Sequence, residues 1–144
     1  MTDEPTTNLD VTIQAQVLYL IKQLKREPGM SVLLIAHDLG VVAMMADRAA
    51  VMYAGKIVEK APAEVLYANP LHPYTRVLLR AIPRPDRDVE ELEAIPGEVP
   101  SPIDPPPGCR FHPRCEYAME KCKREEPAMV EVEADHWVAC HLYG

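Results

Sequence analysis

The first residues able to do chemistry are two adjacent carboxylates near the start of the chain, Asp3 and Glu4. In a nucleotide hydrolase, one carboxylate at a strand end holds Mg²⁺ through water, and the next one polarises the water that attacks the terminal phosphate. A polar stretch follows and closes on Asp10. An Asp-Glu pair on its own is more typical of a solvated turn, so the surrounding elements must decide between these two interpretations.

A histidine about thirty residues further on is the next candidate. The apolar run VLLIA ends at His37, and such a run is typical of a parallel strand that is covered on both faces. Parallel sheets present ligand-contacting groups where their strands end. A single histidine at such a position is more often structural, so His37 also depends on its context.

Four cysteines form the second group, at Cys109, Cys115, Cys122 and Cys140. They are separated by five, six and seventeen residues. The paired C-x2-C spacing of structural zinc sites is absent, which makes zinc possible without favouring it. Four thiolates can also hold a [4Fe-4S] cluster, and the remaining alternative is ordinary free thiols, some of them buried. Three nearby histidines could each replace a cysteine in a zinc site, although hydrogen bonding is the more common role: His112, His136 and His141.

The elements that must position these groups can be predicted from local patterns. Apolar residues at spacings of three and four predict a helix over 11–26, with Asp10 as its N-cap and Pro28 and Gly29 after its end. The apolar strand follows, then a short helix over 39–46 and a hairpin that turns at Ala54 and Gly55. Two further short helices are expected over 63–68 and 74–82.

A proline-rich connector divides the chain. Nine of the fifteen prolines lie between positions 83 and 113, which predicts an extended segment rather than a packed element. The cysteine-containing piece behind it is too small to build much of a core by apolar burial alone. We therefore expect four segments, at 1–60, 61–83, 84–107 and 108–144.

Composition limits the classes of function. The chain has 144 residues, 48% of them hydrophobic, and a formal net charge of −7, so we expect no nucleic-acid partner. No apolar run is long enough to suggest a spanning helix, and the first residues lack the pattern of a signal peptide. In the cytosolic setting that this implies, four cysteines favour metal binding over disulfides.

The order of these features resembles a known family. The series DEPTTNLD, amphipathic helix, apolar strand with His-Asp, and DRAAVMYAGKIVE is similar to the C-terminal half of an ATP-binding-cassette ATPase. The phrase DEPTTNLDVTIQAQV resembles the oligopeptide and dipeptide importer branch. Further along, NPLHPYTRVLLRAIP, IPGEVPSP, PPPGCRFHPRC and HWVAC resemble the C-terminal region of peptide-importer ATPases. Together these matches span nearly the whole chain.

The resemblance implies a role for each candidate residue. Asp3 would be the Walker B residue that binds Mg²⁺ together with ATP, Glu4 the catalytic base, and His37 the switch histidine that contacts the terminal phosphate. Residues 7–10, ending at Asp10, match the D-loop at the interface between two ATPase subunits. The four cysteines would hold a [4Fe-4S] cluster, with zinc as the alternative.

The resemblance also predicts the fold class and identifies family motifs that do not occur in the sequence. We expect an α/β fold, namely the C-terminal half of a P-loop ABC ATPase domain followed by a small, irregular, Cys-rich domain. The Gly-rich phosphate loop, the glutamine loop and the signature motif do not occur in the sequence. We therefore expect a truncated product, an incomplete record or an excised fragment that does not turn over ATP alone, because hydrolysis needs preorganised phosphate binding.

The partners follow from the same resemblance. It implies a second ATPase subunit, two transmembrane permease subunits and, indirectly, an extracytoplasmic peptide-binding protein, with the chain at the cytoplasmic face of the membrane. The function expected of the complete protein is to energise import of dipeptides or oligopeptides. Two alternatives stay open: an importer of nickel or another small solute, and a non-enzymatic adaptor stabilised by its metal site.

Overall fold

The computed structural model describes residues 1–5, 10–81, 97–98, 100–101 and 103–144. These residues form two compact units, Met1–Ala46 and Asp47–Gly144, and each unit is described by itself below. Most of the predicted connector 84–107 lies outside the described residues, as do residues 6–9 of the predicted D-loop. No helix in the described ranges is long and apolar enough to cross a membrane.

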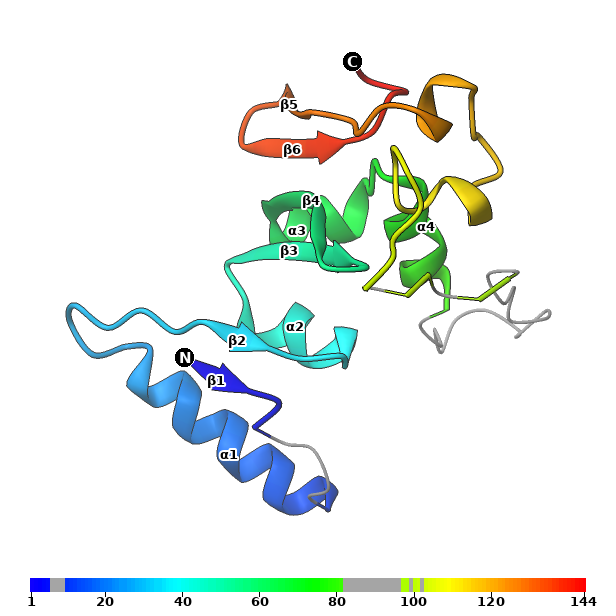
Figure 1. The fold of residues 1–144 in the computed structure, drawn as a ribbon. Helices are drawn as coiled ribbons and strands as arrows, with labels where there is room; N and C mark the ends of the chain where they lie inside the picture. The colour runs from blue at the N-terminus through cyan, green and yellow to red at the C-terminus, as the bar shows by residue number, and fades with distance from the viewer. Residues whose placement is uncertain (6–9, 82–96, 99, 102) are drawn as a thin grey trace. The chain divides into compact units, whose positions relative to one another are not determined.

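The first unit contains a parallel pair of short strands and two helices (Figure 1). Strand β1 (Thr2–Asp3) pairs with β2 (Leu34–Ile35), Thr2 opposite Leu34 and Asp3 opposite Ile35. Helix α1 (Val11–Leu24) connects the two strands, and α2 (Leu39–Met45) follows β2. This order confirms the predicted strand, helix and parallel pairing.

Side-chain caps fix where both helices begin. Asp10 accepts a hydrogen bond from the Ile13 N–H at 2.9 Å, as its predicted N-cap role requires. Asp38 accepts from the N–H groups of Gly40 at 2.8 Å and Val41 at 3.2 Å. Each cap satisfies backbone donors that have no partner inside the helix, a contribution of about 1 kcal/mol each.

The strand β2 is shorter and more exposed than the apolar run predicts. Only Leu34 and Ile35 form the ladder, and Leu33 and Ile35 are exposed to solvent. Within this unit, the described residues provide β2 with one neighbouring strand, β1. An apolar strand becomes fully buried only when a sheet extends on both sides and layers cover both faces.

The second unit is built on a four-stranded antiparallel sheet in the order β3-β4-β6-β5 (Figure 1). The four strands are β3 (Arg48–Tyr53), β4 (Lys56–Pro62), β5 (Met129–Glu133) and β6 (His136–Ala139). Ala54 and Gly55, with φ angles of 44° and 82°, join β3 to β4. Positive φ at both positions is what a tight two-residue hairpin turn requires, which confirms the predicted hairpin.

Two short helices follow β4. Helix α3 (Ala63–Ala68) begins directly after the strand, and α4 (Pro73–Arg80) begins after the segment NPLH. The His72 imidazole caps α4 by accepting a hydrogen bond from the Tyr74 N–H at 3.1 Å. Pro73 occupies the first turn, where its missing N–H has no cost. Both helices lie where the sequence predicts them.

The structure does not show the cysteine-containing segment as a separate domain, because the segment belongs to the same compact unit as β3 and β4. Two 3-10 turns, η1 (His112–Arg114) and η2 (Lys121–Lys123), precede the β5–β6 hairpin. Strand β6 pairs with β4, Glu59 opposite Val138 and Lys60 opposite Trp137. A segment this small gains its burial by extending an existing sheet, because it has too little apolar surface for its own core.

Candidate functional site

The structure brings two of the predicted site residues together at the ends of adjacent strands. Glu4 directly follows β1, and its N–H donates to the Ile35 carbonyl of β2 at 2.8 Å. His37 lies two residues after β2. The Nδ1 atom of His37 lies 2.8 Å from Oε1 of Glu4, with both side chains accessible to solvent. A carboxylate and an imidazole are thus held at one edge of the parallel pair, where such sheets bind ligands.

The backbone of Glu4 has an uncommon conformation. Its φ angle is 42°, in the left-handed region that residues other than glycine rarely adopt. Such a conformation costs on the order of 1 kcal/mol and persists only where the surroundings impose it. Here the hydrogen bond that the Glu4 N–H donates to Ile35 and the one that the Glu4 carboxylate accepts from His37 hold the residue in place.

The other two residues of this predicted site lie on the same unit in different settings. Asp3 is the last residue of β1 and is exposed. Asp10 caps α1, as described above, and the residues between Pro5 and Asp10 lie outside the described ranges. The structure therefore joins Glu4 to His37 directly and places Asp3 next to Glu4 in the chain. The proposed nucleotide roles of all four residues stay predictions.

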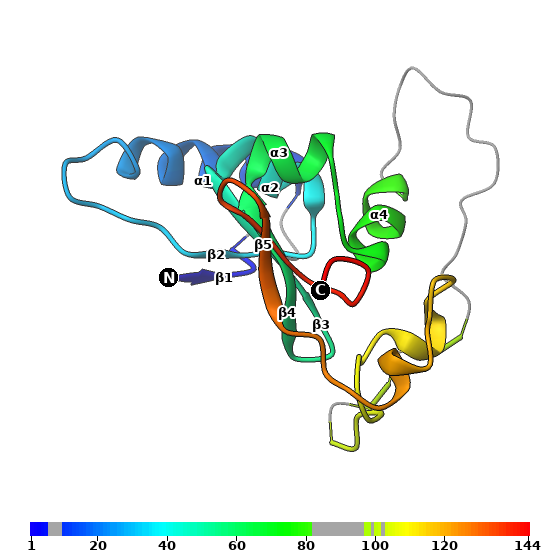
Figure 2. The same cartoon turned by 90° about the horizontal axis from the view of Figure 1, so that it is seen from above.

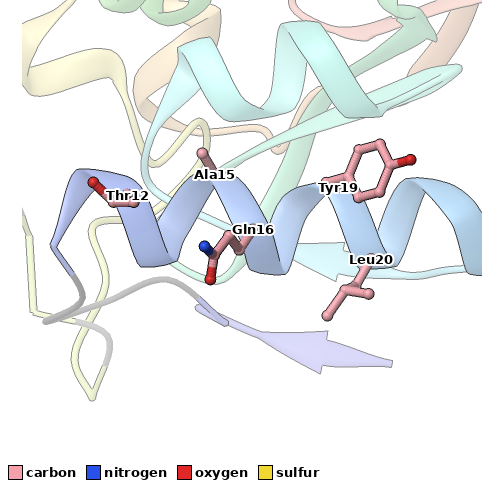
Figure 3. A pocket seen from close by; sticks show the side chains of 5 residues that line it. All are labelled: Thr12, Ala15, Gln16, Tyr19 and Leu20. Atoms are coloured by element: carbon pink, nitrogen blue, oxygen red, sulfur yellow. The ribbon is translucent and has the colours of Figure 1, made fainter.

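A shallow hollow lies on α1 in this unit (Figure 3). It is lined by a single helix, through Thr12, Ala15, Gln16, Tyr19 and Leu20. Tyr19 and Leu20 are both exposed. No carboxylate, histidine or cysteine lines this hollow, so it offers a binding surface but no catalytic group.

The four cysteines gather in the second unit as free thiols. The Cys109 N–H donates to the Cys122 carbonyl at 2.8 Å, and Cys140 is buried just after β6. Burial and, to a smaller extent, the thiols of Cys109, Cys115 and Cys122 together raise the pKa of Cys140 to about 11. The pKa values of Cys109 and Cys115 are raised for the same two reasons.

As the thiols are placed, they do not form a metal site. Among the described residues, no group of three or more His, Cys, Asp and Glu side chains is arranged to hold a metal ion. The donor chemistry suits iron or zinc, since both bind thiolates. The predicted iron–sulfur cluster is therefore not supported by the geometry.

The three nearby histidines have hydrogen-bonding roles, as the sequence indicated. His112 donates from Nδ1 to the Cys109 carbonyl at 2.8 Å, and His141 donates from Nε2 to the Glu125 carbonyl at 2.9 Å. His136 is completely buried and lies 2.8 Å from the Glu59 carboxylate. These contacts account for the histidines without a metal.

Glu59 is a residue that sequence reasoning missed. It is fully buried, although it belongs to a strand, KIVEKAP, that mixes polar and apolar residues without strict alternation. The only signal in the sequence is its place in β4 between Val58 and Ala61, both of which are also buried. Its partners lie up to 77 residues away, so no local pattern could have identified them.

Known proteins match this chain in two ways, over its C-terminal part and over nearly its whole length. A family model described as "Oligopeptide/dipeptide transporter, C-terminal region" matches residues 58–122. The dipeptide transport ATP-binding protein DppD of Caldanaerobacter subterraneus is 47% identical over 141 residues, 98% of this chain and 43% of that protein. The oligopeptide transport ATP-binding protein AppD of Bacillus subtilis is 53% identical over 141 residues, with the same coverage of both chains.

The chain spans less than half of the length of these two relatives. The match to both of them nevertheless extends over nearly all of its residues, including the Glu4–His37 edge and the cysteine segment. These similarities show that the chain belongs to the family of oligopeptide and dipeptide transporter ATP-binding proteins, with that family's C-terminal region at residues 58–122.

Proposed function

We propose that this chain supplies one side of an ATP-hydrolysing site in a protein that energises the import of dipeptides or oligopeptides. The observation that carries the proposal is the 2.8 Å contact between Glu4 and His37 at the ends of β1 and β2. In this role ATP and Mg²⁺ supply the reacting phosphate and neutralise its charge. The similarity to transport ATP-binding proteins supports the same function.

Each residue of the edge has a proposed task. The Glu4 carboxylate accepts a proton from the attacking water, and the hydrogen bond from His37 orients that carboxylate. Asp3, at the end of β1, holds the metal ion through its carboxylate. Asp10 lies at the start of α1, where a D-loop would meet a second ATPase subunit. The sequence contains no Gly-rich phosphate loop, so we expect the isolated chain to be inactive.

The proposed assembly follows from this function. The chain would act at the cytoplasmic face of the membrane with a second ATPase subunit and two transmembrane permease subunits, and indirectly with an extracytoplasmic peptide-binding protein. Within the chain, residues 1–60 would belong to the ATPase domain and 61–83 to a helical extension. Residues 84–107 would connect that extension to the cysteine segment, 108–144.

A gain-of-function experiment tests the proposal. Joining the chain to an upstream segment that contains a phosphate loop, taken from a relative such as AppD, should confer Mg²⁺-dependent ATP hydrolysis. The same upstream segment alone and the 144-residue chain alone serve as the two controls. Hydrolysis in the joined protein but in neither control supports the proposal. Equal activity in the joined protein and the upstream segment would instead favour the alternative, a non-enzymatic adaptor module.

The substrate of the transporter needs its own measurement. Uptake of labelled dipeptides and oligopeptides by cells that carry the complete protein should be lost when Glu4 is replaced by Gln. If those cells keep peptide uptake but lose uptake of nickel or another small solute, the peptide assignment is wrong and the small-solute alternative is correct.

We also propose that the cysteine segment binds a [4Fe-4S] cluster, after a rearrangement of the thiols. The donor chemistry supports this, because the four cysteines of the segment can supply four thiolate ligands. The cluster would stabilise the segment, because the cysteines would act as thiolate ligands instead of remaining buried neutral thiols. Anaerobic purification with iron, sulfide and zinc assays tests it: stoichiometric zinc with negligible iron would establish zinc instead.

A further inference from the structure

The buried carboxylate of Glu59 connects three separate segments of the second unit. Its Oε1 atom accepts a hydrogen bond from the Leu71 N–H at 2.8 Å and lies 2.8 Å from Nε2 of His136. Its Oε2 atom accepts from the His72 N–H at 2.9 Å. A carboxylate with two backbone donors acts as acceptor only, so His136 is the donor in the third bond. Strand β4, the turn before α4 and strand β6 thus meet at one side chain.

Glu59 is also the partner that fixes the His136 ring. Both side chains are completely buried. The second ring nitrogen of His136, Nδ1, is buried and has no hydrogen-bond partner within the described ranges. The Glu59 contact therefore orients the His136 ring and places this end of β6.

The residues held by Glu59 form the environment of Cys140. Leu71, Val138 and Cys140 pack together as one buried cluster, with Val130 and Tyr143 against it. Val138 lies directly opposite Glu59 in the β4–β6 pairing. The Cys140 thiol therefore packs against Leu71, whose backbone N–H donates to Glu59, and against Val138, which lies opposite Glu59 in the sheet.

The far side of Cys140 is held by a second set of contacts. The Tyr143 hydroxyl donates to the Leu71 carbonyl at 3.1 Å and accepts from the Arg76 guanidinium at 2.9 Å. The Tyr143 N–H donates to the Cys140 carbonyl at 3.0 Å. The turn at the C-terminal end lies beside α4 accordingly (Figure 2). Leu71 is thus bound through its N–H by Glu59 and through its carbonyl by Tyr143.

We infer that Glu59 and His136 are positioning residues for the Cys140 thiol, and that they keep this thiol buried against Leu71 and Val138. The inference builds on the proposed cysteine site, because positioning Cys140 matters most if all four thiols act together. The experiment uses the metal-free chain, so a failed iron assay would refute the cluster and leave the positioning of Cys140 intact.

The test is the rate at which each thiol reacts with iodoacetamide in the reduced, metal-free 144-residue chain, mapped by mass spectrometry. Glu59→Gln places an amide N–H₂ against a buried backbone or ring N–H, so one donor loses its acceptor. We expect Cys140 to react about 10-fold faster or more, because a buried thiol reacts through local opening. The rate of Cys115, which is partly exposed, should stay within about twofold.

A pair of variants at His136 gives an independent answer if Glu59→Gln does not fold. His136→Leu removes the donor to Glu59 and should accelerate Cys140 selectively, whereas His136→Gln retains an N–H at a similar reach and should restore the slow rate. Asp135→Asn is the matched control, since it breaks the Arg48–Asp135 ion pair at the exposed tip of the same hairpin. An unchanged Cys140 rate, or equal acceleration of all four thiols, would overturn the inference.

Discussion

At the scale of single residues, the chain uses charged and polar groups in two contrasting settings. Glu4 and His37 meet in solvent at the end of a strand pair, where a ligand can reach them. Glu59 and His136 meet in a completely buried position, where a missing partner would leave an uncompensated polar group. The first arrangement suits chemistry, and the second suits the fixing of structure.

His72 gives the second unit a defined dependence on pH. Burial lowers the pKa of His72 from 6.5 to about 4, with Glu59 opposing that shift and Arg76 adding to it. The unfolded chain therefore binds one more proton between these two pH values. The neutral His72 therefore contributes to the free energy of unfolding of the second unit. This contribution is fully present above about pH 6.5 and is lost as the pH falls toward 4, by up to about 3 kcal/mol.

Urea unfolding at pH 7 and pH 4.5 measures this loss, with fluorescence of Trp137, the single tryptophan, reporting on the second unit. The control is His72→Asn, which keeps an N-cap acceptor for Tyr74 but does not titrate. The unaltered chain should lose about 2 kcal/mol more than the variant between the two pH values. Equal losses in both proteins would show that His72 does not titrate in this way.

At the scale of elements, local sequence signals predicted the individual helices and the β3–β4 hairpin, whereas contacts between distant residues determined how the other strands pair. The caps Asp10 and His72 and the Ala54–Gly55 turn each act within three residues, so the helices and the β3–β4 hairpin could be predicted. The pairing of β4 with β6 joins Lys60 to Trp137 across a segment that has no local signal for it. The sequence therefore suggested a separate cysteine domain where the structure has a shared sheet.

The start of the cysteine segment depends on a close approach at Gly108. Its φ angle is 71°, and a Cβ atom there would lie 2.3 Å from the Cys122 carbonyl oxygen and 2.9 Å from the Arg124 nitrogen. Gly108→Ala should therefore destabilise the second unit by at least about 2 kcal/mol. The backbone at Cys122 and Arg124 must shift to make room for the Cβ atom, and a positive φ angle is unfavourable for alanine. The same change should separate Cys109 from the Cys122 carbonyl to which it donates.

Thermal unfolding of Gly108→Ala and Gly97→Ala separates the cost of the close contact at Gly108 from the cost of the positive φ angle. Gly97 has a φ angle of 81°, but a Cβ atom there meets only the Arg114 side chain at 3.6 Å, so this control should cost only the conformational term of about 1 kcal/mol. Similar losses for both substitutions would mean that the close approach at Gly108 contributes nothing.

At the scale of the whole molecule, the two units differ in how well their apolar residues are covered. In the first unit, Tyr19, Leu20 and Leu33 are exposed around a helix and a strand pair whose pattern suits burial. In the second unit, β4, α3, α4 and β6 all contain buried residues. The resemblance to a family identified Glu4 and His37 as candidate site residues, but not their contact, because the two residues lie 33 positions apart and no local pattern connects them.

The central claim is that Glu4 activates water in a site completed by a phosphate-binding segment. The most direct measurement compares ATP hydrolysis and ATP binding by the joined protein carrying Glu4 or Glu4→Gln. We predict that hydrolysis falls by about 100-fold or more, the usual contribution of a general base, while ATP binding changes by less than about threefold, because an amide preserves the shape of the side chain. Hydrolysis that stays within a few-fold of the unaltered protein would contradict the account.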